Sequence, residues 1–267
     1  MDKFQVYKDI QARTNGEIYI GVVGPVRTGK STFIRRFMEL MVLPQITDEN
    51  ERIRTQDELP QAAAGKTIMT TEPKFIPKEA VSIRLDAEDE LSVRMIDCVG
   101  YLVDGASGHI ENEKERMVHT PWFDYDIPFT EAADIGTRKV INEHSTIAVV
   151  VTTDGTIGDL KRENYISAEE RTIQELKALG KPFVVVLNTN RPHSESTREL
   201  VDTLEKQYDV RVTAVNCEQM KHEDIDRIIK LLLESFPVKE ISFWFPQWLE
   251  ILPNDHHMKR DVIKMVS

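Results

Sequence analysis

Short runs of apolar residues alternate along the chain with segments whose apolar residues recur at helical spacing. Such runs are typical of buried parallel strands, and the spacing between them is that of amphipathic helices. The pattern predicts an α/β fold, a mostly parallel sheet with helices on both faces. The predicted strands are Ile18–Gly24, Val81–Leu85, Leu91–Asp97, Ile147–Thr153, Phe183–Asn188 and Val210–Val215. The predicted helices are Lys30–Met41, Glu131–His144, Ala168–Leu179, Ser196–Tyr208 and Glu223–Phe236.

Two stretches, Thr47–Pro77 and Val103–Thr130, interrupt this rhythm and are predicted to be loops. Loops longer than ~12–15 residues inside a compact domain are usually functional or mobile. After Pro237 the composition changes, and the chain ends on Asp255–Ser267 without an obvious terminal element. We therefore expect a nucleotide-binding domain over residues 1–237, and over 238–267 the truncated start of a following domain.

The segment Gly24-Pro25-Val26-Arg27-Thr28-Gly29-Lys30-Ser31 fits the pattern G-x-x-x-x-G-K-[ST]. It follows a predicted strand and precedes a predicted helix, which is the context that a phosphate-binding loop requires. Glycines let the backbone wrap around a phosphate, and the helix N-terminus offers free N–H groups. We expect Lys30 to reach the β- and γ-phosphates and the Ser31 hydroxyl to ligate Mg²⁺, with Thr32 beside the α-phosphate.

A second phosphate-side element, Asp97-Cys98-Val99-Gly100, ends the strand LSVRMID. An Asp at this place can hold Mg²⁺ through water, and the N–H of Gly100 can contact the γ-phosphate. Between the two elements lie Thr70 and Thr71. Either threonine can bind Mg²⁺ and the γ-phosphate and so order a switch loop, and the spacing does not choose between them.

This order of elements is that of GTPase-type (TRAFAC) P-loop proteins, which read guanine with N-K-x-D after a later strand. The equivalent segment here is Asn188-Thr189-Asn190-Arg191. Arg191 carries no acceptor for the guanine N–H groups, so Asn188 remains while the base-reading Asp is lost. The loss favours ATP or a loose choice of base, and a compensating Asp from another loop stays an alternative.

Together, GPVRTGKSTFI, QDELPQAAAGKTIMTTEPKF, DCVGY, TPWF, IPFTEAADIGTRKVINEHSTI and TTDGTIGD resemble the stage IV sporulation protein A family over about residues 1–237. The resemblance implies an ATPase that uses ATP and Mg²⁺ and self-assembles into a static polymer, the basement layer of the spore coat. It implies as partners stage V sporulation protein M at the forespore membrane and other coat proteins.

By motif match, the resemblance also assigns site residues. The catalytic set is Lys30, Asp97, Thr70 and Thr71, and the metal set is Ser31, Asp97 and Thr71. The nucleotide-binding set is Gly24, Pro25, Val26, Arg27, Thr28, Gly29, Lys30, Ser31, Thr32, Gly100 and Asn188.

The net charge and the number of cysteines limit which partners and which cellular compartment can be expected. The chain of 267 residues has 34 Lys and Arg against 45 Asp and Glu, a net charge of −11, which disfavours nucleic acid as a partner. Two cysteines, Cys98 and Cys217, suit a reducing compartment. Neither a signal peptide nor an apolar run of ~20 residues is found. We expect a cytoplasmic protein that, by the resemblance, lies in the mother cell, peripheral to the outer forespore membrane.

Two other functions remain open on the sequence. One is a nucleotide-gated switch that binds a partner without polymerising, and the other is a small-molecule kinase, for which no acceptor site is recognisable. Tyr101 stands where fast GTPases carry a water-activating Gln. Arg27 is either an internal charge stabiliser near the γ-phosphate or a solvated loop residue.

Overall fold

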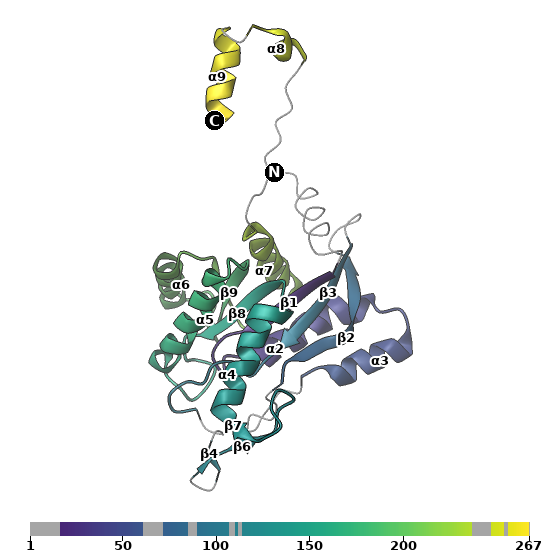
Figure 1. Cartoon of the computed structure of the whole chain (residues 1–267), viewed down its shortest axis with the longest axis vertical. Helices are drawn as coiled ribbons and strands as arrows, with labels where there is room; N and C mark the ends of the chain where they lie inside the picture. The colour runs from purple at the N-terminus through teal and green to yellow at the C-terminus, as the bar shows by residue number, and fades with distance from the viewer. Residues whose placement is uncertain are drawn as a thin grey trace. The chain divides into compact units, whose positions relative to one another are not determined.

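The computed structural model describes residues 17–60, 72–84, 90–106, 110–111, 114–236, 247–253 and 256–266 (Figure 1). The chain divides into two compact units, Met1–Phe236 and Pro237–Ser267. The first unit contains the sheet and the phosphate-binding loop.

The first unit is built on a six-stranded sheet with the order β10-β9-β8-β1-β3-β2. Its strands are β1 (Glu17–Val23), β2 (Lys74–Arg84), β3 (Glu90–Asp97), β8 (Ile147–Thr153), β9 (Phe183–Asn188) and β10 (Val212–Val215). All neighbouring strands are parallel except β2 and β3. The prediction of a mostly parallel α/β sheet is confirmed, and β1 lies at its centre, so the loop after β1 opens at the carboxyl edge between β8 and β3.

The strand predicted at Val81–Leu85 is longer than the sequence indicated. It begins at Lys74 and runs antiparallel to β3 as the sheet edge. The connection between β2 and β3 is too short for a crossover helix, so the two strands form a hairpin. The register of this pair shifts between Ile76 and Val81. This irregularity interrupts the alternation of apolar and polar residues, so the first half of the strand could not be recognised in the sequence.

Helices cover both faces of the sheet (Figure 1). They are α2 (Lys30–Phe37), α3 (Glu49–Glu58), α4 (Phe129–Lys139), α5 (Ile166–Ala178), α6 (Glu195–Tyr208) and α7 (His222–Glu234). Helices α2 and α4 continue into π-helical segments, Met38–Val42 and Val140–His144, and short 3₁₀ turns lie at Leu43–Gln45 and Arg162–Tyr165. One apolar core joins α2 and α7 to the sheet, and a second joins α5 and α6 to the opposite face.

Both stretches predicted to be loops contain regular structure. Helix α3 lies within Thr47–Pro77, and its Asp48 side chain caps the helix by accepting from the N–H of Glu51. Its only buried residue is Thr55, so no apolar face marked it in the sequence. The second stretch holds the short strands β4 (Ile110–Glu111), β5 (Lys114–Glu115), β6 (Met117–Val118) and β7 (Ile127–Pro128).

The second unit also corrects the sequence prediction. It contains α8 (Gln247–Ile251) and α9 (His257–Val266), although no terminal element was predicted there. Across the described part of the chain, every helix is too short or too polar to span a membrane.

Candidate nucleotide-binding site

The loop between β1 and α2 has the backbone of a phosphate-binding loop. Gly24 and Gly29 have positive φ angles of 128° and 93°, and Gly29 caps α2 by accepting from the N–H of Phe33. A Cβ at Gly24 would come within 2.4 Å of the carbonyl oxygen of Val151. Both glycines are therefore required, one by close approach to β8 and one by the turn into the helix.

Lys30 is the cation of this loop and is 5% exposed. Its Nζ donates to the carbonyl oxygens of Pro25, at 2.6 Å, and Gly24, at 3.4 Å. Burial lowers the pKa of Lys30, and the nearby Cys98 and Asp97 groups oppose that shift. A Cβ at Gly100 would lie 2.5 Å from Nζ, so the ammonium group lies directly against the D-x-x-G segment.

The two predicted metal-side residues meet. The Ser31 hydroxyl donates to Oδ2 of Asp97 over 2.9 Å, although 66 positions separate them in sequence. Oδ1 of Asp97 is buried and has no hydrogen-bond partner among the described residues. Burial raises the pKa of Asp97, while the Lys30 charge and the Ser31 hydroxyl lower it. The pair thus presents a hydroxyl and a carboxylate oxygen, both hard ligands, beside the lysine.

The segment after Asp97 is held against the loop and against α4. Gly100 has φ 93° and donates its N–H to Oγ1 of Thr137 at 3.2 Å. The carbonyl of Tyr101 accepts from the N–H of Val26 at 2.9 Å. Thr137, which the sequence analysis did not identify, lies in α4 and is fully buried.

Asn188 joins the phosphate-binding loop to the end of β10. Its Nδ2 donates to the carbonyl of Thr28 at 2.9 Å, and its Oδ1 accepts from the N–H of Cys217 at 3.0 Å. The side chain therefore braces two loops at the carboxyl edge of the sheet. The Cys217 N–H was missed as a partner of Asn188, although its place two residues after a parallel strand could have indicated it.

The segment after β8 is hydrogen-bonded to the segment after β9, where the base-reading motif was expected. Oδ2 of Asp154 accepts from Oγ1 of Thr189 at 2.6 Å, and its Oδ1 accepts from the N–H and the hydroxyl of Thr156. Asn190 donates through its N–H and side-chain amide to Oγ1 and O of Thr156. The side chain of Arg191 is exposed. Asp154 is thus an acidic residue near the base-reading position, but both its oxygens already accept from protein groups.

The structure brings Gly24–Ser31, Asp97, Gly100 and Asn188 together at one edge of the sheet. Arg27 is partly buried with a left-handed φ of 61°, and Thr32 is partly exposed in the first turn of α2. Thr70 and Thr71 lie outside the described residues, so their assigned roles stay predictions.

The central parallel sheet, the glycine-bearing loop after β1 and the Ser31–Asp97 pair define a P-loop nucleotide-binding protein of GTPase-type topology. The chain belongs to the stage IV sporulation protein A family, because residues 1–237 match the family model "Stage IV sporulation protein A, ATPase domain".

Relatives of the same description are found in several bacteria. Stage IV sporulation protein A of Bacillus anthracis and that of Bacillus subtilis (strain 168) are each 52% identical over 267 residues, covering 100% of this chain and 54% of theirs. That of Clostridioides difficile (strain 630) is 52% identical over 258 residues, covering 97% and 52%. The chain therefore spans about half the length of these relatives.

Among solved structures, the chain is similar to an SsGBP and GDP complex, with TM-score 0.46, 14% identity and coverage of 87% of this chain and 56% of the other. It is also similar to Roco2 RocCORdC of Methanosarcina barkeri bound to GDP, with TM-score 0.42, 15% identity and coverage of 82% and 49%.

Proposed function

We propose that residues 1–237 form an ATPase domain that binds ATP with Mg²⁺ and hydrolyses its terminal phosphoanhydride. The observation that carries the proposal is that Asp97 and Gly100 meet Ser31 and Lys30 of the phosphate-binding loop. The family description, an ATPase domain, supports ATP as the nucleotide. Residues 238–267 would begin a following domain of the longer protein.

The residues at this edge fit a magnesium ion. The buried Oδ1 of Asp97 lacks a partner among the described residues, and the Ser31 hydroxyl lies beside the same carboxylate. Carboxylate, hydroxyl, water and phosphate oxygens are the ligands that Mg²⁺ prefers. Bound there, the ion would neutralise charge on the β- and γ-phosphates. Ser31 would hold it directly and Asp97 through water, while Lys30 and the loop N–H groups orient the phosphates.

We expect ATP to bind better than GTP. Arg191 stands where a guanine-reading Asp is needed, and both oxygens of Asp154 are engaged with Thr156 and Thr189. Each lost hydrogen bond to a charged acceptor removes roughly 1.5–3 kcal/mol from guanine binding. Displacement of labelled ATP by unlabelled ATP and GTP measures the preference. GTP displacing the label far better than ATP would overturn the assignment.

We further propose, from the family resemblance, that the nucleotide state drives self-assembly into a static polymer of the spore coat. This activity would belong to the longer protein, in the mother-cell cytoplasm at the outer forespore membrane. The implied partners are stage V sporulation protein M and other coat proteins. A nucleotide-gated switch that binds a partner without polymerising is the alternative, and light scattering of the longer protein with ATP separates the two.

The double change Thr70→Ala with Thr71→Ala tests how the nucleotide state couples to assembly. We expect nucleotide binding to persist, because Lys30 and the loop N–H groups remain. Hydrolysis should be lost, because Thr70 or Thr71 is expected to bind Mg²⁺ and the γ-phosphate. The nucleotide-dependent change in self-association should be lost as well, because a ligand shifts two states only through different affinities for them. Sedimentation of the longer protein with ATP and with a non-hydrolysable analogue measures this. A double variant that pellets with ATP as the parent does would contradict the coupling.

A further inference from the structure

Tyr101 follows the D-x-x-G segment directly and is only 1% exposed. Its hydroxyl donates to Oε2 of Glu175 in α5. The guanidinium carbon of Arg171, also in α5, lies 3.8 Å from the centre of its ring, within the range of a cation–π contact. Both the ring and the hydroxyl of Tyr101 are therefore held by α5, so this side chain is not available to orient an attacking water.

The residues that hold Tyr101 are themselves fixed. Arg171 donates to Oδ2 of Asp134 in α4 at 2.8 Å and to Oε1 of Glu175 at 3.3 Å. Arg138 of α4 lies 3.6 Å from the same oxygen of Glu175. These ionic groups thus form one network across α4 and α5. In it, Arg171 faces the carboxylates of Asp134 and Glu175, and each carboxylate faces at least one arginine.

The backbone next to Tyr101 is part of the candidate site. The carbonyl of Tyr101 accepts from the N–H of Val26 inside the phosphate-binding loop. One residue earlier, Gly100 donates to Thr137, whose hydroxyl donates to the carbonyl of Ala133 at 2.7 Å. Gly100 also lies against the ammonium group of Lys30. A shift of the Tyr101 backbone would therefore disturb Val26 in the phosphate-binding loop and Gly100 beside Lys30.

We propose that Tyr101 is a positioning residue, anchored by Glu175 and Arg171 so that Asp97 and Gly100 keep their place beside Lys30. The proposal rests on the proposed hydrolysis and deepens it. In Gln-type machinery the residue after D-x-x-G works through its own side chain. Here it acts through its backbone, which links the phosphate-binding loop to α4 and α5.

Glu175→Ala removes the acceptor of the Tyr101 hydroxyl and one partner of Arg171. We expect kcat for ATP to fall about tenfold while KM stays within about twofold, since small misplacements slow chemistry more than binding. Tyr101→Phe keeps the ring under Arg171 and loses only the hydroxyl, so a smaller fall in kcat is expected. Combined, the two changes should cost less than the product of the single effects, because both break the same bond.

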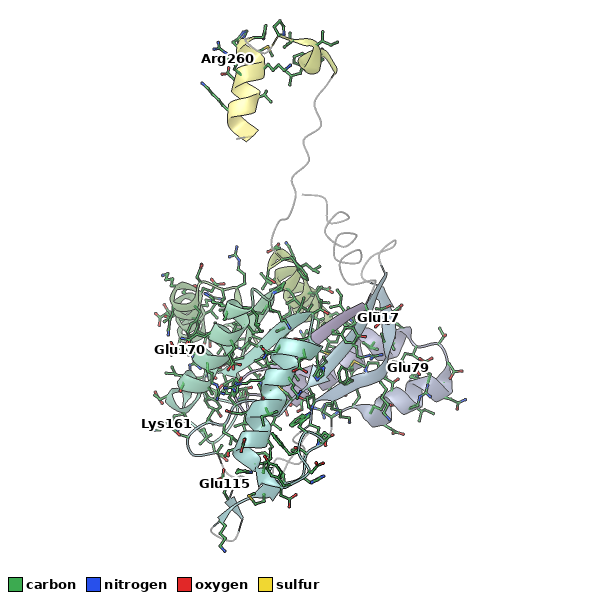
Figure 2. All side chains as sticks on the ribbon, viewed as in Figure 1. Glu17, Glu79, Glu115, Lys161, Glu170 and Arg260 are labelled. Carbon is green, nitrogen blue, oxygen red and sulfur yellow. The ribbon has the colours of Figure 1, made fainter. Side chains whose placement is uncertain are left out.

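Glu170→Ala is the matched control. Glu170, labelled in Figure 2, is a partly exposed acidic residue of the same helix and accepts from Nε2 of Gln174 at 3.1 Å. Its loss should leave kcat, KM and hydrogen exchange unchanged. An equal fall of kcat in Glu170→Ala and Glu175→Ala would show a general effect of α5 and overturn the proposal.

Hydrogen exchange of the peptide that contains Gly100 and Tyr101 reports the anchor without using activity. Exchange should be faster in Glu175→Ala and Tyr101→Phe than in the parent and in Glu170→Ala. Faster exchange with unchanged kcat would mean that the anchor does not position the chemistry. If the parent hydrolyses no nucleoside triphosphate, the proposed function fails. Unchanged exchange in Glu175→Ala would then still refute the anchor.

Discussion

Lys30→Ala is expected to weaken ATP binding by about a hundredfold and to remove detectable hydrolysis. The ammonium group faces the β- and γ-phosphates in the proposed complex, and each hydrogen bond between charged groups is worth roughly 1.5–3 kcal/mol. The Nζ of Lys30 donates to the carbonyl oxygens of Gly24 and Pro25, and alanine offers neither a charge nor a donor in its place. Titration calorimetry with ATP and Mg²⁺, together with a phosphate-release assay, measures both effects.

Asp97→Ala separates binding from chemistry. The change leaves Lys30 and the loop N–H groups in place, but it removes the carboxylate that holds Ser31 and would hold the magnesium-bound water. Hydrolysis should therefore fall about a hundredfold, while ATP affinity changes only severalfold. Equal losses of binding in Lys30→Ala and Asp97→Ala would contradict this division of roles. Lys230→Ala, on the exposed side of α7, removes one charge away from the loop and should change neither quantity.

Arg162→Ala is expected to lower the free energy of unfolding by about 3–5 kcal/mol. Glu169 is fully buried, and its two oxygens accept from the two terminal nitrogens of Arg162 at 2.7 and 2.6 Å. The same guanidinium donates to Oγ1 of Thr152 and to the carbonyl of Thr153. Without it, the Glu169 carboxylate would be buried without a counter-charge. Urea denaturation followed by circular dichroism measures the change.

The chain offers a matched pair at the surface. Arg52 donates to both oxygens of Glu49 at 3.1 and 2.7 Å, with side chains that are 46% and 65% exposed. Arg52→Ala should leave the urea midpoint unchanged, because water solvates the freed carboxylate. A second comparison, Arg162→Met with Glu169→Leu, should recover much of the loss. Equal destabilisation by Arg162→Ala and Arg52→Ala would show that burial of Glu169 is not the cause.

The sequence alone determined most strands of the sheet and the phosphate-binding loop, because both depend on residues that are neighbours along the chain. The apolar runs predicted five of the six sheet strands to within a few residues. The clearest of them, β8 and β9, are buried at every residue, and a strand buried on both faces needs apolar side chains throughout. The phosphate-binding loop was recognisable because the residues that form it, Gly24 to Ser31, are consecutive in the sequence. Helix α3 was missed because it buries almost nothing, and half of β2 was missed because its pairing with β3 is irregular.

Tertiary structure alone decided which side chains meet. The Ser31–Asp97 contact crosses 66 positions, that of Tyr101 with Glu175 crosses 74, and that of Asn188 with Thr28 crosses 160. No local preference encodes such contacts, because they depend on the strand order that places β1 between β8 and β3. The same order brings Thr137 of α4 to Gly100 and Asp154 to Thr189. The sequence therefore determined the phosphate-binding chemistry, while the packing of α4 and α5 on the sheet decided how the D-x-x-G segment is held beside it.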